Sequence, residues 1–464
     1  MNLKELHSVY FLGIGGIGMS AIARWFNHIG IPVYGYDKTP SPLTALLGQE
    51  GMQITYVDEV DTLPHTLVSN KEQSLVVWTP AIPKDSKLLG YFRAEGFALK
   101  KRSEVLGMIT ASMYAVAVAG THGKTTTSSM VAHLLKHAGR NVAAFLGGVT
   151  QNYESNLILS DDKGEDAPIV VVEADEFDRS FLRLHPNIAV VTSVDPDHLD
   201  IYGDDQHLKE GFAEFIKLID PKGRLYIQKN ALANLGSTPS LTTIPYGIQA
   251  GDIYAENVNA GIASFSFDYT SASQRIPDLV IHMPGFHNVE NALAAIGVAL
   301  QLGLSEQQIR DGLASFRGVK RRFEILHQEE GKVYIDDYAH HPEEIRAFLK
   351  SVKAMYPANK LTAVFQPHLY TRTRDFAEGF SSALSLADEV VLLDIYPARE
   401  LPLPGVNSEM LLEKITAGRK SVQSKEGLIG YLEANQPEVL VTVGAGDIDR
   451  LVQPINNWIK SYGR

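Results

Sequence analysis

One segment of the sequence combines the residue types that bind phosphate groups. It reads Gly120, Thr121, His122, Gly123, Lys124, Thr125 and Thr126. Glycines let backbone amides curl around a phosphate, a lysine neutralises its charge, and a threonine hydroxyl can reach a magnesium ion. The segment follows an apolar run over residues 114–119, which predicts a strand, and it precedes a predicted helix. The pattern predicts a nucleotide-binding loop, the alternative being a simple turn at a helix start. It departs from G-x-x-x-x-G-K-[ST], because Val118 stands where the first glycine belongs.

Acidic residues and one histidine follow two further predicted strands. Glu173 and Asp175 follow the run 168–172, and Asp195, Asp197, His198 and Asp200 follow the run 188–192. In an open parallel sheet, ligands bind at the carboxyl ends of the strands, where the glycine loop also lies. Glu173 and His198 therefore predict a magnesium site beside nucleotide phosphates, with Asp197 behind them. For Asp175, Asp195 and Asp200, capping of helix N-termini is an equal alternative.

Near the amino terminus, a second glycine-rich turn follows a predicted strand and opens a predicted helix. Its sequence is Gly13-Ile14-Gly15-Gly16-Ile17-Gly18, and Asp37 lies 19 residues beyond the last glycine. This spacing fits the dinucleotide fingerprint. The same geometry suits the diphosphate of a nucleotide sugar, so spacing alone leaves NAD and a UDP-sugar equally open.

Two further segments bring histidine, tyrosine and arginine to predicted strand ends. They are Asp336-Asp337-Tyr338-Ala339-His340-His341-Pro342 and Gln366-Pro367-His368-Leu369-Tyr370-Thr371-Arg372-Thr373-Arg374. Such side chains suit a small substrate that carries a carboxylate, which an arginine can grip with its fork. The alternative is a structural turn before the proline.

Two asparagines and two arginines in the second half of the chain suggest further ligand contacts. Asn288 and Asn291 could hydrogen-bond an adenine edge, although an asparagine near a helix start is often a cap. Arg321 and Arg322 lie at an expected domain boundary, where a closing domain could deliver a cation to phosphates.

Alternating short apolar runs and amphipathic stretches must position these residues. The pattern predicts an α/β protein of three open-sheet units, with an antiparallel patch over residues 251–282. We expect domains at residues 1–107, 108–320 and 321–464.

Composition narrows the class of protein. The 464 residues are 45% hydrophobic and 21% charged, which is typical of a folded globular chain. The net charge of −12 argues against nucleic acid and anionic membrane as partners. The chain has no cysteine, which excludes disulfides and thiolate metal sites and fits a reducing cytoplasm. No signal peptide or membrane-spanning run is expected, and the sequence does not define an oligomeric state.

Together these segments resemble the Mur ligase family, the ATP-dependent amide-forming enzymes of peptidoglycan precursor synthesis, in order across nearly the whole chain. The matching motifs are G-I-G-G-I-G-M-S from Gly13, G-T-H-G-K-T-T from Gly120, E-A-D-E from Glu173, D-H-L-D from Asp197, H-N-V-E-N from His287, R-R-F-E from Arg321, D-D-Y-A-H-H-P from Asp336 and F-Q-P-H-L-Y-T-R-T from Phe365. The resemblance implies an N-terminal Rossmann-like UDP-binding domain, a central P-loop ATP-binding domain with a mixed sheet, and a C-terminal Rossmann-like domain that binds an amino acid.

The resemblance also implies a role for each site residue. The UDP-sugar would lie on Gly15, Gly16 and Gly18 near Asp37, so no nicotinamide is expected. ATP would bind the loop from Gly120 to Thr126, with Asn291 at adenine and Arg322 and Asp337 at the domain interface. Thr125, Glu173 and His198 would hold magnesium, and Lys124, Glu173, His198 and Arg322 would be catalytic. Tyr338, His340 and Arg372 would contact the amino acid.

Two features qualify the match. Leu369 occupies a place often held by arginine, which puts a two-arginine clamp on the amino-acid carboxylate in doubt. Related ligases use a carbamoylated lysine, but neither Lys209 nor Lys217 stands in a matching context, so the sequence does not assign this modification.

The implied activity is ATP- and Mg²⁺-dependent ligation of L-alanine to the lactyl carboxylate of UDP-N-acetylmuramate through an acyl phosphate. Such an enzyme would serve cell wall biogenesis, and with it cell shape and division. One alternative is a recycling ligase that joins a ready-made murein tripeptide to the same sugar nucleotide. A second alternative, from a different class, is a non-catalytic nucleotide sensor.

Overall fold

The computed structural model describes residues 3–160, 167–195, 205–236, 241–398 and 400–461. The chain divides into two compact units, one of residues 1–253 and 294–312 and the other of residues 254–293 and 313–464. Three sheets with surrounding helices confirm the predicted α/β class. The domain boundaries expected after residues 107 and 320 stay predictions.

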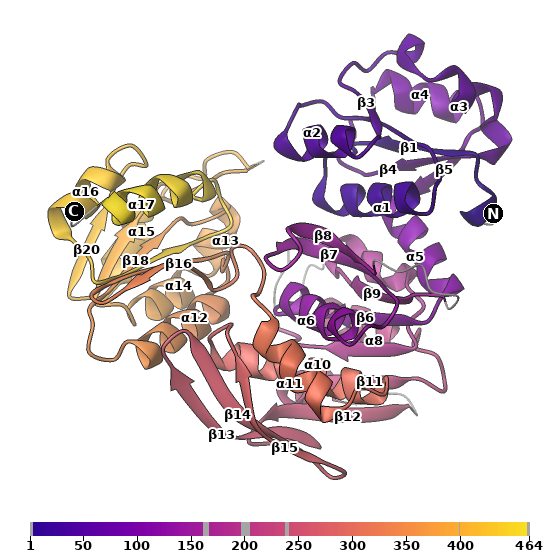
Figure 1. Cartoon of the computed structure of the whole chain (residues 1–464). Coiled ribbons are helices and arrows are strands. Elements are labelled where there is room, and N and C mark those ends of the chain that lie inside the picture. The colour runs from indigo at the N-terminus through magenta and orange to yellow at the C-terminus, as the bar shows by residue number, and fades with distance from the viewer. Residues whose placement is uncertain (1–2, 161–166, 196–204, 237–240, 399, 462–464) are drawn as a thin grey trace. The chain divides into compact units, whose positions relative to one another are not determined.

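The amino-terminal sheet is parallel, with strand order β3-β2-β1-β4-β5. Helices cover both of its faces, with α1 on one side and α3 and α4 on the other (Figure 1). Its elements are β1 (Ser8–Leu12), α1 (Ile17–His28), β2 (Val33–Tyr36), α2 (Pro42–Gln49), β3 (Gln53–Thr55), α3 (His65–Ser69), β4 (Ser74–Trp78), α4 (Lys87–Ala94), β5 (Ala98–Lys101) and α5 (Arg102–Ser112). The continuous burial of β1 reflects this two-sided cover.

In the central sheet, the strands of the first unit follow the order β12-β11-β10-β6-β9-β7-β8. They are parallel except β8, which runs antiparallel to β7 and makes the sheet mixed, as predicted. The elements are β6 (Ala115–Ala119), α6 (Lys124–His137), β7 (Val142–Thr150), β8 (Ser155–Leu159), β9 (Ile169–Glu173), β10 (Ile188–Val191), α8 (Asp205–Ile216), β11 (Arg224–Gln228), α9 (Lys229–Leu235) and β12 (Thr242–Ile248).

The second unit opens with strands in the order β15-β14-β13, where β14 and β15 are antiparallel, as predicted for residues 251–282. These strands are β13 (Ile253–Gly261), β14 (Ser264–Ser271) and β15 (Arg275–Ile281). Helices α10 (Phe286–Gln301) and α11 (Glu306–Ser315) carry residues of both units.

The carboxy-terminal sheet of the second unit has the order β16-β17-β21-β18-β19-β20, and only β16 is antiparallel to its neighbour. Helix α17 covers one face, and α12 and α14 cover the other (Figure 1). The elements are β16 (Glu324–Glu329), β17 (Lys332–Asp337), α12 (Pro342–Met355), β18 (Leu361–Phe365), α13 (Tyr370–Asp375), α14 (Ala377–Leu384), β19 (Glu389–Leu392), α15 (Ser408–Lys414), β20 (Arg419–Val422), α16 (Leu428–Asn435), β21 (Val439–Val443) and α17 (Asp449–Ser461).

Within the described part of the chain, no helix is both long enough and apolar enough to span a bilayer.

Replacing Gly107 by alanine should destabilise the first unit. A Cβ at Gly107, in α5, would lie 2.3 Å from the carbonyl oxygen of Arg183. Because backbone must move to accept it, Gly107→Ala should cost about 1–3 kcal/mol and lower the Tm in thermal unfolding. Gly90→Ala, in α4, is the control, since nothing lies within 4 Å of its added Cβ. That variant should gain about 0.5–1 kcal/mol. An unchanged Tm for Gly107→Ala would contradict this close packing.

His133 should make stability depend on pH. It is 3% exposed in α6, and its Nδ1 lies 2.8 Å from the Tyr153 hydroxyl. Burial, and then the neighbouring His137, lower the pKa of His133 from 6.5 to about 4. The unfolded chain therefore binds a proton between these pH values that the folded chain excludes, so stability falls as pH falls through that range.

Chemical unfolding across that pH range tests this effect. His133→Gln should show a shallower loss of stability on acidification than the parent protein. His65→Gln, at an exposed position, is the control and should keep the parent slope. Equal slopes for His133→Gln and the parent would disprove the assignment.

Candidate functional site

The predicted phosphate loop connects β6 to α6 and bends sharply at two glycines. Gly120 and Gly123 have φ angles of +138° and +83°, which favour glycine. A Cβ at Gly120 would lie only 2.1 Å from Thr192 Oγ1, so the loop backbone passes directly over the end of β10. The conformation of the loop backbone therefore explains why glycine stands at both positions.

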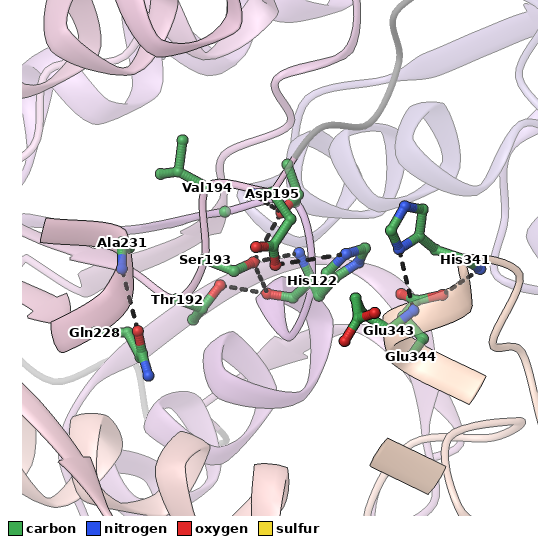
Figure 2. A network of polar contacts seen from close by, with 12 residues as sticks. His122, Thr192, Ser193, Val194, Asp195, Gln228, Ala231, His341, Glu343 and Glu344 are labelled. Carbon is green, nitrogen blue, oxygen red and sulfur yellow. Dashed lines mark hydrogen bonds and ion pairs between the residues drawn. The ribbon is translucent and has the colours of Figure 1, made fainter. Parts of the chain in front are cut away.

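Side chains that follow β10 hold this loop in place. Ser193 Oγ accepts a hydrogen bond from the His122 backbone N–H at 2.8 Å and lies 2.9 Å from Thr121 Oγ1. The Asp195 N–H donates to Thr121 Oγ1 at 3.1 Å. Figure 2 shows Ser193 and Asp195 beside His122. The motif alone did not reveal Ser193, whose only signal was its position after a predicted strand.

Lys124 is the first residue of α6, and its ammonium group points back to the loop. Its Nζ donates to the Gly120 carbonyl oxygen at 2.6 Å and lies 2.7 Å from Oε2 of the fully buried Glu176. Burial alone would lower the pKa of Lys124, but Glu176, Asp175 and Glu173 outweigh it and raise that pKa. Lys124 therefore keeps its positive charge, which an incoming phosphate requires.

The structure describes two of the three side chains that were predicted to bind magnesium, and both offer oxygen atoms. Thr125 is buried in the first turn of α6, and Glu173 ends β9, the sheet neighbour of β6. The Gly147 N–H donates to Glu173 Oε2 at 2.8 Å, and a Cβ at Gly147 would lie 2.4 Å from Glu173 Oε1. A hydroxyl and a carboxylate fit Mg²⁺, which takes its other ligands from water and phosphate.

His198, the third predicted magnesium ligand, falls outside the described residues, as do Asp197 and Asp200. Among the residues that are described, no group of three or more metal-binding side chains is arranged to hold a metal ion. The magnesium site stays a prediction that the described donors fit.

The amino-terminal glycine turn borders a pocket of about 500 Å³ at the start of α1. Gly16, Gly18 and Asp37 line it, whereas Gly15 lies behind and donates its backbone N–H to Asp37 Oδ2 at 2.8 Å. A Cβ at Gly15 would lie 2.8 Å from Asp37 Oδ2, so a larger residue there would displace the Asp37 side chain. The pocket suits a diphosphate at a helix N-terminus.

Arg102 supplies a cation to this pocket that sequence reasoning did not assign. A Cβ at Gly18 would lie 2.5 Å from Arg102 Nη1, and Arg102 also lines a small neighbouring cavity with Glu173 and Asp175. Arg102 therefore borders both the glycine pocket and the small cavity that Glu173, a predicted metal ligand, also lines. The basic run at residues 100–102 was the available signal in the sequence.

In the second unit, Asp337 is anchored by backbone amides beside Arg322. Its carboxylate accepts hydrogen bonds from the N–H groups of Phe323 and Ala339, both at 2.7 Å. Burial raises the pKa of Asp337 to about 7, and the positive charge of Arg322 opposes that shift. The buried Asp337 and the partly exposed Arg322, both predicted to contact the nucleotide, thus belong to one cluster.

Asn291 is held in place at the start of α10. Its Nδ2 donates to Asn288 Oδ1 at 3.1 Å, and Asn288 Nδ2 donates to the Pro284 carbonyl oxygen at 2.7 Å. Asn288 therefore acts as a support for Asn291, which leaves the adenine role predicted for Asn291 untested.

Aromatic side chains form a row along the carboxyl edge of the carboxy-terminal sheet. The ring centroids of Tyr338 and His340 lie 5.4 Å apart, those of His340 and His368 6.4 Å, and those of His368 and Tyr396 5.8 Å. The guanidinium of Arg322 lies 5.0 Å from the Tyr338 ring centroid. Tyr338 and His340, both predicted to contact the amino acid, thus lie together, and His368 connects them to Tyr396, which the sequence had not assigned.

Arg372 lies in α13, which begins after Leu369. Leu369 has a φ of +66°, uncommon for a leucine, and its N–H donates to the Tyr396 carbonyl oxygen at 2.9 Å. The Thr371 N–H donates to Glu400 at 3.0 Å. These contacts define the loop before Arg372, whose role in binding the amino acid stays a prediction.

Comparisons with known proteins agree along the chain. Family models match residues 8–114 (Mur ligase family, catalytic domain), 118–299 (Mur ligase middle domain) and 321–446 (Mur ligase, glutamate ligase domain). A UDP-N-acetylmuramate–L-alanine ligase of Cytophaga hutchinsonii is 48% identical over 458 residues, covering 98% of this chain and 97% of the relative. One of Parabacteroides distasonis is 48% identical over 456 residues, covering 98% of both chains.

Solved structures give the same result. The UDP-N-acetylmuramate-alanine ligase of Thermotoga maritima superposes with a TM-score of 0.79 at 29% identity, covering 98% of this chain and 99% of the other. A murein peptide ligase of Psychrobacter arcticus has a TM-score of 0.67 at 22% identity, covering 99% and 100%, a likeness of fold alone. By sequence identity over its full length and by fold, this chain belongs to the Mur ligase family.

Proposed function

We propose that this chain joins L-alanine to the lactyl carboxylate of UDP-N-acetylmuramate, with conversion of ATP to ADP and phosphate. The observation that carries the proposal is 48% identity over 98% of the chain to proteins named for that activity. The phosphate loop, the glycine pocket and the aromatic row support it, because they offer places for a nucleotide triphosphate, a sugar diphosphate and a small amino acid.

The reaction must first activate a carboxylate, which is a poor electrophile. The lactyl carboxylate attacks the γ-phosphate of ATP, an acyl phosphate forms, and ADP leaves. The amine of alanine then attacks the acyl carbon, phosphate leaves, and an amide remains. This order supplies a leaving group that the free carboxylate lacks.

Each step places a demand on side chains of this chain. Lys124 offsets the negative charge that accumulates as carboxylate and triphosphate approach, and the loop amides orient the phosphates. Thr125 and Glu173, with His198, would hold magnesium, which when bound supplies charge neutralisation and polarises phosphate oxygens. Arg102 and the glycine pocket orient the sugar diphosphate.

The acceptor would lie at the aromatic row of the second unit. Tyr338, His340 and Arg372 are the residues that we assign to alanine, and Arg322, Asn291 and Asp337 to the nucleotide. Because water hydrolyses an acyl phosphate, excluding it from the site is part of the proposed function. The proposal places the enzyme in the cytoplasm, in peptidoglycan precursor synthesis, and thereby in the maintenance of cell shape and division.

Phosphate release with different acceptors tests this assignment. With ATP, Mg²⁺ and UDP-N-acetylmuramate, release should require L-alanine, and mass spectrometry should show a product heavier by one alanyl residue. Release only with the L-alanyl-γ-D-glutamyl-diaminopimelate tripeptide would instead identify a recycling ligase. Binding of ATP without release for any acceptor would identify a nucleotide sensor.

Removing the loop lysine should separate catalysis from sugar-nucleotide binding. Lys124→Ala should lower kcat at least about 10²–10³-fold, since it removes a preorganised positive charge at the reacting phosphates. Calorimetric binding of UDP-N-acetylmuramate, which occupies a different pocket, should change little and serves as the internal control. Near-normal turnover by Lys124→Ala would refute the proposed role of this lysine.

A further inference from the structure

Glu344 lies in the first turn of α12 and has two sets of partners. Its side chain is 12% exposed, and its Oε2 accepts hydrogen bonds from the backbone N–H groups of His340 at 2.9 Å and His341 at 3.3 Å. These bonds complete a capping box with His341. Figure 2 shows Glu344 beside His341 at the start of this helix.

The same carboxylate also approaches two side chains of the proposed site. Glu344 Oε2 lies 3.4 Å from His340 Nδ1, and Glu344 Oε1 lies 4.0 Å from Arg322 Nη1. We assign these two partners to different substrates, His340 to the amino acid and Arg322 to the nucleotide. Glu344 therefore spans the two halves of the site.

Tyr338 completes the arrangement. The Arg322 guanidinium lies 5.0 Å from the Tyr338 ring centroid, and the centroids of Tyr338 and His340 are 5.4 Å apart. Arg322 is thus held between an aromatic face and a carboxylate, and His340 between the same ring and the same carboxylate. A displacement of either side chain changes the environment of the other.

We propose that Glu344 is a positioning residue that couples Arg322 to His340, so that the nucleotide and amino-acid sites form together. This inference rests on the proposed function and deepens it. Glu344 does not touch either substrate in this proposal. Its negative charge orients an arginine and a histidine that do.

Helix capping by itself does not require a negative charge at position 344. Glutamine serves at the third position of a capping box as well as glutamate does, because its side-chain oxygen accepts the same backbone hydrogen bonds. Glu344→Gln removes the charge and replaces one carboxylate oxygen by an NH₂ group, but it keeps an oxygen that can cap the helix. The substitution therefore separates helix capping from the attraction to Arg322 and His340.

The neighbouring Glu343 offers a matched control. It also lies in the first turn of α12, but its side chain is 57% exposed and pairs with Arg346 at 3.4 Å. Glu343→Gln removes one negative charge from the same helix turn. It changes the net charge and the helix dipole as much as Glu344→Gln does.

Steady-state kinetics on the full-length enzyme test the proposal. Glu344→Gln should raise the KM for alanine and the KM for ATP, each up to about fivefold, the loss expected for one partly exposed ion pair. The KM for UDP-N-acetylmuramate and the Tm should stay close to the parent values. Glu343→Gln should match the parent in every constant.

Three results would overturn the inference. Glu344→Gln could retain both parent KM values while Glu344→Ala loses stability, which would leave only a capping role. Glu344→Gln could raise one KM alone, which would remove the link between the sites. Glu343→Gln could reproduce the effect, which would assign it to general charge.

A direct binding measurement distinguishes failure of this inference from failure of the proposed function. Calorimetric titration with ADP requires no ligation, and Glu344→Gln should bind ADP up to about fivefold more weakly than Glu343→Gln does. Absence of ligation by the parent enzyme would refute the proposed function. Equal ADP affinities of the two variants would refute the role of Glu344.

Discussion

Parallel pairing of β6 with β9 and β10 is the constraint on which the candidate phosphate site depends. The register places Val118 opposite Glu173 on one side and opposite Val190 on the other. The glycine loop, the carboxylate of Glu173 and the hydroxyl of Ser193 therefore emerge from the same edge of the sheet. The close approach of Gly120 to Thr192 follows from this geometry, and any side chain there would push the loop away from β10.

Two buried carboxylates, each paired with a cation, are the second organising feature. Lys124 lies against the fully buried Glu176, and Arg321 Nε donates to the fully buried Asp336 at 2.9 Å. Removing one partner of such a pair leaves an uncompensated buried charge, which costs about 3–5 kcal/mol. These pairs hold their cations in one orientation, and a site that must bind phosphates needs that fixed orientation.

The second unit combines polar and aromatic contacts around two acidic residues, Asp337 and Glu344. Asp337 is anchored by backbone amides, whereas Glu344 reaches side chains from two different segments. The row from Tyr338 to Tyr396 crosses the carboxyl edge of a sheet in which β21 lies between β17 and β18. Ligands of open α/β sheets bind at such a change of strand order, which supports an amino-acid site there.

The sequence by itself determined the α/β class, the glycine loop at Gly120 and the strands that precede this loop, Glu173 and Asp195, because hydrophobic period and glycine spacing are local properties. It also brought Glu173, Tyr338 and His340 forward as candidates, since residues after parallel strands share one edge. Tertiary structure alone decided that Glu176 pairs with Lys124, that Ser193 holds the loop and that Glu344 joins Arg322 to His340. Some of these partners lie far apart in the sequence, and the others meet only because of the direction in which their side chains point. The spacing of residue types along the chain reveals neither the distant contacts nor the side-chain directions.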